Sequence, residues 1–165
     1  MKWIISVILG SLLVLVACSD DTLKTESEPA TSTSEKENGE DHINYLMNLQ
    51  MEMISVVRKH VKTVSAYEVS QGETGDRDEA VQASNRIANE LRGIEVPAEI
   101  NSALQTDMKD SIELLALYFE ERAAAISSGE DKADMEAALG EFHEKIGATF
   151  ESVGLLAPNF GKDLY

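Results

Sequence analysis

The sequence lacks several features that define common protein classes. Its 165 residues include one cysteine, three prolines and 5% aromatic residues, with 14 Lys and Arg against 30 Asp and Glu. One cysteine cannot form an internal disulfide bond, so the chain is not a disulfide-stapled domain. The length suits about one domain. The net charge of -16 repels phosphate backbones, so nucleic acid is not an expected partner.

The N-terminal residues have the features of a secretory signal. Lys2 precedes an apolar run over residues 3–16. This run is shorter than the roughly 20 residues that a membrane-spanning helix needs. One basic residue, a short apolar run and a small residue at its end are typical of a signal peptide.

The apolar run ends in Leu15-Val16-Ala17-Cys18, which resembles the lipobox of bacterial lipoproteins. In that family the cysteine thiol is joined to diacylglycerol, and the chain is cut just before it. The resemblance implies a signal peptide over residues 1–17 and a mature chain that starts at Cys18. It also implies a lipid anchor in the cell membrane, on the extracytoplasmic face. Two or three acyl chains give stable anchoring, whereas one binds only marginally.

Residues 18–41 have the composition of a disordered tether. After Cys18 they contain eight acidic and two basic residues, with Leu23 as the only large apolar side chain. Such a segment cannot bury enough apolar surface to offset the entropy of ordering. As a flexible coil it would reach on the order of 25 to 30 Å from the membrane.

From residue 42 the apolar residues recur three and four positions apart, which is typical of helices. The predicted helices cover residues 42–67, 77–92, 98–127 and 131–156, and residues 157–165 form an irregular tail. Four helices with short connections pack most simply as an antiparallel up-down-up-down bundle. The sequence therefore predicts an all-α fold, with a four-helix bundle over residues 42–156 behind the signal peptide and tether.

Local signals support these helix boundaries. Asp41 is the expected N-cap of the first helix, and Asp76 with Glu79 forms a capping box at the second. Gly93 ends the second helix, and Pro97 suits the opening of the third. The fourth helix is expected to bury a stripe of residues spaced three and four apart: Met135, Leu139, Phe142, Ile146, Thr149 and Val153.

The chain contains no recognisable catalytic motif. None of its three histidines lies in a nucleophile motif, and there is no phosphate-binding loop or dinucleotide turn. No glutamate lies three residues before a histidine, which excludes the di-iron site of helical bundles. We therefore expect a protein that is not an enzyme and that needs no cofactor or metal.

A haem- or metal-binding carrier is the alternative. Met53 of the first helix could lie level with His143 of the fourth, and His60 adds a further ligand. The thioethers of Met47 and Met51 would suit Cu(I). Methionine on the apolar face of a helix is far more often core filler, however, and this interpretation is favoured.

One pattern in the fourth helix is unusual. Gly140, Gly147 and Gly154 recur every seven residues, although each glycine costs roughly 1 kcal/mol against alanine inside a helix. The strip reflects either tolerated sequence drift or close contact with a neighbouring helix of the bundle. The alternative is a contact surface for another protein's helix or a second copy of the chain.

The sequence as a whole predicts a membrane-anchored extracytoplasmic lipoprotein that acts by binding. It would be an accessory module for an envelope protein or wall component. Val96-Pro97-Ala98-Glu99-Ile100 resembles the corresponding stretch in small helical lipoproteins of Bacillus-like bacteria. That resemblance implies no activity.

Overall fold

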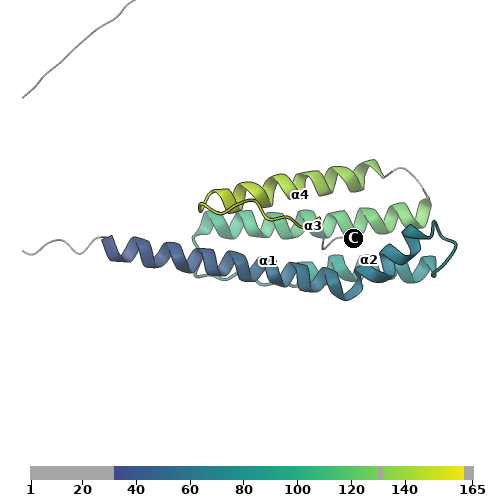
Figure 1. Cartoon of the computed structure of the whole chain (residues 1–165), viewed down its shortest axis with the longest axis horizontal. Coiled ribbons are helices and arrows are strands. Elements are labelled where there is room, and N and C mark those ends of the chain that lie inside the picture. The colour runs from purple at the N-terminus through teal and green to yellow at the C-terminus, as the bar shows by residue number, and fades with distance from the viewer. Residues whose placement is uncertain (1–31, 130–131, 162–165) are drawn as a thin grey trace, which may run out of the picture. The chain divides into compact units, whose positions relative to one another are not determined.

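The computed structural model describes residues 32–129 and 132–161, with side chains from residue 41 onward (Figure 1). These residues contain no strand and form the helices α1 (Ser32–Val69), α2 (Arg77–Arg92), α3 (Ser102–Ser128) and α4 (Ala133–Glu151). The prediction of an all-α fold built from four packed helices is confirmed. None of these helices is both long and apolar enough to cross a membrane.

The start of α1 differs most from the prediction. The helix begins at Ser32 and not at residue 42, so Asp41 lies inside it and is not an N-cap. Glu35, Lys36 and Glu37 are good helix formers, and extending an existing helix is far easier than nucleating one. Residues 32–41 of the predicted tether are therefore helical in the structure. Residues 18–31 of the tether, like the signal peptide, lie outside the described residues.

Helix α2 has the predicted bounds, and Asp76 is its N-cap. Asp76 Oδ1 accepts hydrogen bonds from the backbone N–H groups of Asp78 at 2.7 Å and Glu79 at 3.0 Å. These bonds satisfy two of the donors that a helix leaves unpaired at its N-terminus.

Helix α3 begins at Ser102, later than predicted, because Asn101 is its N-cap. The Asn101 Oδ1 atom accepts a hydrogen bond from the backbone N–H of Leu104 at 2.9 Å. The side chain of Gln105 donates to the carbonyl oxygens of Ala98 and Ile100. Those carbonyls are therefore satisfied outside a helix, and the residues after Pro97 form a turn.

Consecutive helices pack against each other: α1 with α2, α2 with α3, and α3 with α4. Between α2 and α3, Ser84 Oγ donates a 2.7 Å hydrogen bond to the carbonyl of Phe119. Near the end of α2, Arg92 Nε lies 2.9 Å from Glu113 Oε2. Side chains from α2 and α3 thus meet both in the core and at the surface of this helix pair.

The core takes large apolar side chains from every helix. It includes Leu46, Met53, Val57, Val64, Ile87, Leu91, Met108, Leu115, Phe119, Phe142, Ile146 and Phe150. In α4 the predicted stripe is the inner face. Phe142, Ile146 and Thr149 are buried, and the other three members are half-buried.

The chain after α4 turns back along that helix (Figure 1). Phe160 in this segment is 1% exposed, and its ring lies 5.0 Å from the ring of Phe142. The core therefore includes a side chain from outside the four helices.

Candidate binding site

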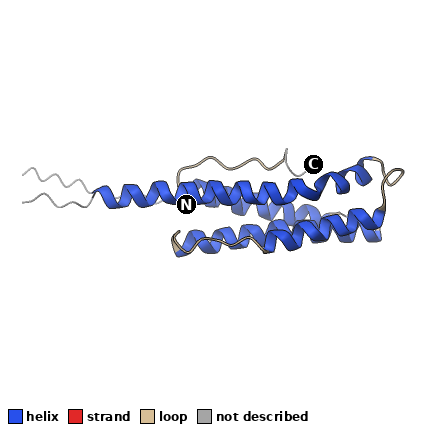
Figure 2. Cartoon of the chain, turned by 90° about the horizontal axis from the view of Figure 1, so that it is seen from below, coloured by secondary structure: helices blue, strands red, loops and turns tan. Residues whose placement is uncertain are grey.

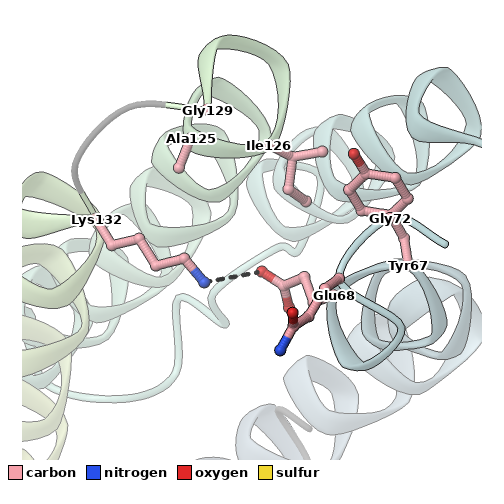
Figure 3. A pocket seen from close by; sticks show the side chains of 8 residues that line it. Tyr67, Glu68, Gly72, Ala125, Ile126, Gly129 and Lys132 are labelled. Atoms are coloured by element: carbon pink, nitrogen blue, oxygen red, sulfur yellow. Dashed lines mark ion pairs between the residues drawn. The ribbon is translucent and has the colours of Figure 1, made fainter.

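A pocket of about 270 Å³ lies where the end of α1 meets the end of α3. Its lining residues come from the last turns of both helices and from the connections that follow them. They are Tyr67, Glu68, Gln71, Gly72, Ala125, Ile126, Gly129 and Lys132 (Figure 3). We call this the end pocket.

The turn after α1 shapes one wall of the end pocket. Gly72 has a φ of 81°, and a Cβ atom there would lie 3.3 Å from the hydroxyl oxygen of Tyr67. A glycine is therefore needed for the turn to lie close to the Tyr67 ring. Gln71 has a φ of 53° and is the only non-glycine residue with a positive φ in the described part of the chain. A non-glycine residue with a positive φ has a modest energetic cost, which the surrounding structure must offset.

Two cations fix the Glu68 carboxylate in this pocket. Arg122 of α3 places Nη2 at 2.5 Å and Nε at 3.2 Å from Glu68 Oε2. Lys132 Nζ lies 3.9 Å from Glu68 Oε1, and Figure 3 shows the two side chains pointing toward each other. Arg122 is 1% exposed, and its guanidinium lies over the rings of Tyr118 and Phe119 at 5.7 and 5.8 Å. A buried arginine of this kind is stable only when its charge is paired.

The end pocket thus offers two kinds of contact. Ile126, Ala125 and the Tyr67 ring give it an apolar wall. Glu68 and Lys132 supply charged groups at its edge, where they can bind polar atoms. Its volume is below the range of about 300 to 1,000 Å³ that is typical of small-molecule pockets. The space therefore suits one or two side chains of a partner better than a large free ligand.

The three glycines of the predicted strip have unlike surroundings. A Cβ atom at Gly140 would meet nothing within 4 Å. Gly147 is buried, and a Cβ atom there would lie 3.5 Å from the Cβ of Ala157 in the chain's own returning segment. The Gly147 position is therefore covered from within the same chain.

Gly154 is not inside a helix, so the premise of a helical strip is wrong at this position. Helix α4 ends at Glu151 and not at residue 156. The N–H of Gly154 donates to the carbonyl of Glu151, and that of Leu155 donates to the carbonyl of Phe150. With its φ of 80°, Gly154 ends the helix in the left-handed conformation that favours glycine.

The residues of the haem or metal alternative lie in unlike surroundings. Met53 is fully buried in the core, whereas His143 is exposed. Met47 and Met51 are 43% and 56% exposed. Within residues 41–129 and 132–161, no three His, Cys, Asp or Glu side chains gather closely enough to hold a metal ion.

His60 belongs instead to a polar contact between α1 and α2. Its Nε2 atom lies 2.8 Å from Glu90 Oε1, and Lys59 Nζ lies 3.1 Å from Glu90 Oε2. These hydrogen bonds, that of His60 first, lower the pKa of the Glu90 carboxyl below its ordinary value. The pair therefore links two helices at the surface.

Arg122 and Glu68 are not among the residues predicted from the sequence to form a site. One signal was present: Arg122 continues the apolar spacing of Ile112, Leu115 and Phe119 in α3. A basic residue on a buried stripe indicates a buried ion pair. Its partner lies 54 residues away in the chain, and no local pattern identifies it.

Comparison with known proteins adds no relative. No protein-family model matches the chain, and no curated protein or solved structure matches it either. Cys18 lies outside the described residues.

Proposed function

We propose that the chain is a lipoprotein anchored through Cys18 to the extracytoplasmic face of the cell membrane. Its helical bundle acts by binding and not by catalysis, as an accessory module for an envelope protein. The anchor is supported by Leu15-Val16-Ala17-Cys18 at the end of a short apolar run. Two acyl chains on one cysteine are sufficient for stable membrane attachment.

One observation supports the binding role most strongly. The Glu68 carboxylate, which Arg122 holds in place, lies beside a pocket with an apolar wall. Arg122 holds one oxygen of this carboxylate, and Lys132 lies 3.9 Å from the other. The partner group that fits has an apolar body and a polar end, such as a side chain exposed on an envelope protein. Contacts of this type are small in area but specific in chemistry.

Site-specific photocrosslinking in intact cells tests the binding role. A photoreactive side chain at Lys132, which is exposed at the end pocket, is compared with the same group at Lys109, which is exposed elsewhere on α3. We expect a discrete adduct from position 132 and none from position 109. The adduct should disappear in Cys18→Ala, which no longer holds the bundle at the membrane. Identical adducts from both positions, or none from position 132, would contradict the proposed site.

Metabolic labelling tests the anchor separately. Radioactive palmitate should label the wild-type chain and fail to label Cys18→Ala. Equal labelling of the two chains would show that Cys18 is not the anchor.

A further inference from the structure

The Glu68 carboxylate in the end pocket has one oxygen atom that the fold does not use. Its Oε2 atom accepts hydrogen bonds from Arg122 Nε and Nη2. Its Oε1 atom accepts no hydrogen bond within the described residues, and Lys132 Nζ lies 3.9 Å from it. That distance exceeds the range of a hydrogen bond. Because the Glu68 side chain is 22% exposed, a donor group of a ligand in the pocket can reach Oε1.

Lys132 is held only loosely beside this oxygen. Its side chain is 57% exposed, and Figure 3 shows it reaching across the pocket toward Glu68. An exposed ion pair without a hydrogen bond contributes little to stability. Arg122, by contrast, is buried and contacts the other carboxylate oxygen. A cation from another molecule can therefore take the place of Lys132 without breaking the buried pair.

The backbone also favours a cation in the end pocket. Helices α1 and α3 both end here, next to the loop that joins α1 to α2 (Figure 2). The C-terminal end of a helix carries a partial negative charge that stabilises nearby cations, and neither helix has a basic residue in its own last turn. One cation already binds this end of α3, since Arg77 Nη1 donates a 3.4 Å hydrogen bond to the carbonyl of Ser127. An anion would instead meet the Glu68 carboxylate and two negative helix ends.

The apolar wall determines the rest of the ligand. Ala125, Ile126 and the Tyr67 ring line one side of the pocket, and Glu68 lies at its edge. A lysine side chain has the matching order of groups, because its hydrocarbon stem ends in a single ammonium. The net charge of -16 also attracts basic surfaces to the chain as a whole.

The single available oxygen favours an ammonium over a guanidinium. A guanidinium binds a carboxylate best through two parallel hydrogen bonds, one to each oxygen. In the end pocket Arg122 already contacts Oε2 of Glu68, which leaves only Oε1 for a ligand. An ammonium is a compact point charge and needs only one oxygen.

We propose that the end pocket binds a primary ammonium group on an aliphatic stem, supplied by a lysine side chain of the partner protein. The ammonium replaces Lys132 beside Glu68 Oε1, and the stem packs against Ile126 and the Tyr67 ring. The lysine as the source of the ammonium rests on the proposed function, in which a partner protein enters this pocket.

Amide NMR shifts of the full chain in nonionic detergent test the ammonium site. The probe is n-butylammonium, which has the stem and head of a lysine side chain, and the reporters are the pocket residues Gly72 and Gly129. We expect saturable shifts of both amides with this probe and none with n-butanol or butyrate. We expect n-propylguanidinium to bind at least about threefold more weakly. Saturable shifts with butyrate, none with n-butylammonium, or tighter binding of the guanidinium would overturn the proposal.

Replacement of Lys132 distinguishes a specific cation site from general attraction to an acidic chain. Lys132→Ala removes the competing ammonium and should tighten n-butylammonium binding about two- to fivefold. Lys109→Ala makes the same change of net charge at an exposed residue elsewhere on α3 and should leave the affinity unchanged. Weaker binding of the probe to Lys132→Ala, or equal tightening in both variants, would overturn the proposal.

The source of the ammonium is tested in the photocrosslinked adduct from position 132. The captured peptide should contain a lysine beside the crosslinked residue, and a captured peptide without lysine would overturn the assignment. Binding of n-butylammonium without any adduct would support the ammonium site but contradict a partner protein, so that a free amine is the ligand. An adduct from a chain that binds no n-butylammonium would support the proposed function and overturn the ammonium site.

Discussion

Arg122 Nη2 on α3 lies 2.5 Å from Glu68 Oε2 on α1. This ion pair connects two helices that are not consecutive, whereas the extensive backbone packing is between consecutive helices. It also forms one side of the end pocket, where Lys132 approaches the other carboxylate oxygen. The same pair therefore holds the bundle together at this end and positions the charge that we propose binds a partner.

Replacing Glu68 should lower the free energy of unfolding much more than replacing an exposed glutamate that also pairs with an arginine. Glu68→Gln removes the charge of the carboxylate that the buried Arg122 guanidinium contacts and should lower the free energy of unfolding by about 2 kcal/mol. Glu113→Gln weakens the more exposed contact with Arg92 and should cost less than about 1 kcal/mol. Urea unfolding of both variants measures the difference. Equal losses would show that burial of Arg122 does not control this contact.

Acid should remove the stabilisation that Glu120 supplies. Hydrogen bonds from Arg92 lower the pKa of this carboxyl below its ordinary value of 4.5. A lowered folded-state pKa stabilises the fold above pH 4.5, and this contribution is lost as the pH falls through the lower value. Glu120→Gln should therefore be less stable than wild type by about 0.5 to 1 kcal/mol at pH 7, and equally stable in strong acid.

Thermal unfolding across this pH range measures the effect. Glu99→Gln is the control, because Glu99 is exposed and has no ion pair within the described residues. A gap between wild type and Glu120→Gln that widens as the pH falls would contradict the assignment.

The three glycines should respond differently to alanine. Gly140→Ala should stabilise the protein by about 1 kcal/mol, because the new methyl group meets open space in a helix. Gly154→Ala should destabilise it by about 1 to 2 kcal/mol, because alanine disfavours the φ of 80°. Gly147→Ala should gain less than Gly140→Ala, since its methyl group contacts Ala157. Melting temperatures of the three single variants test this order. Equal shifts at all three positions would support the helical glycine strip that the sequence predicts.

The returning segment should contribute to stability through Phe160. Phe160→Ala removes a 1% exposed ring from the core and should cost about 3 kcal/mol. Leu156→Ala, at a side chain that is 91% exposed in the same segment, should change stability by no more than about 0.5 kcal/mol. Similar effects at both positions would mean that the segment does not pack as described.

Two parts of this fold could be predicted because their sequence signals are local. Helix α2 has the predicted bounds because Asp76 caps its first turn and Gly93 follows the last turn. The inner face of α4 was predicted because Phe142, Ile146 and Thr149 keep helical spacing. Both signals act within a few residues of the structure that they specify.

The features that were missed depend on contacts between distant residues. Gly154 fits a heptad pattern in the sequence, but the structure uses it to end α4. Phe160 lies in an irregular tail and is buried only because the chain turns back onto Phe142. The end pocket likewise needs the pairing of Arg122 with Glu68, which no single helix contains. Periodicity predicts which face of a helix is buried, but not which distant side chain meets it.

Mass spectrometry of the intact mature chain, extracted from the membrane, shows directly whether Cys18 carries the anchor. We expect a chain whose first residue is Cys18 and whose mass includes a diacylglyceryl group on that residue. An unmodified Cys18, or a mature chain that begins at Met1 or at another cleavage point, would contradict the proposed anchor.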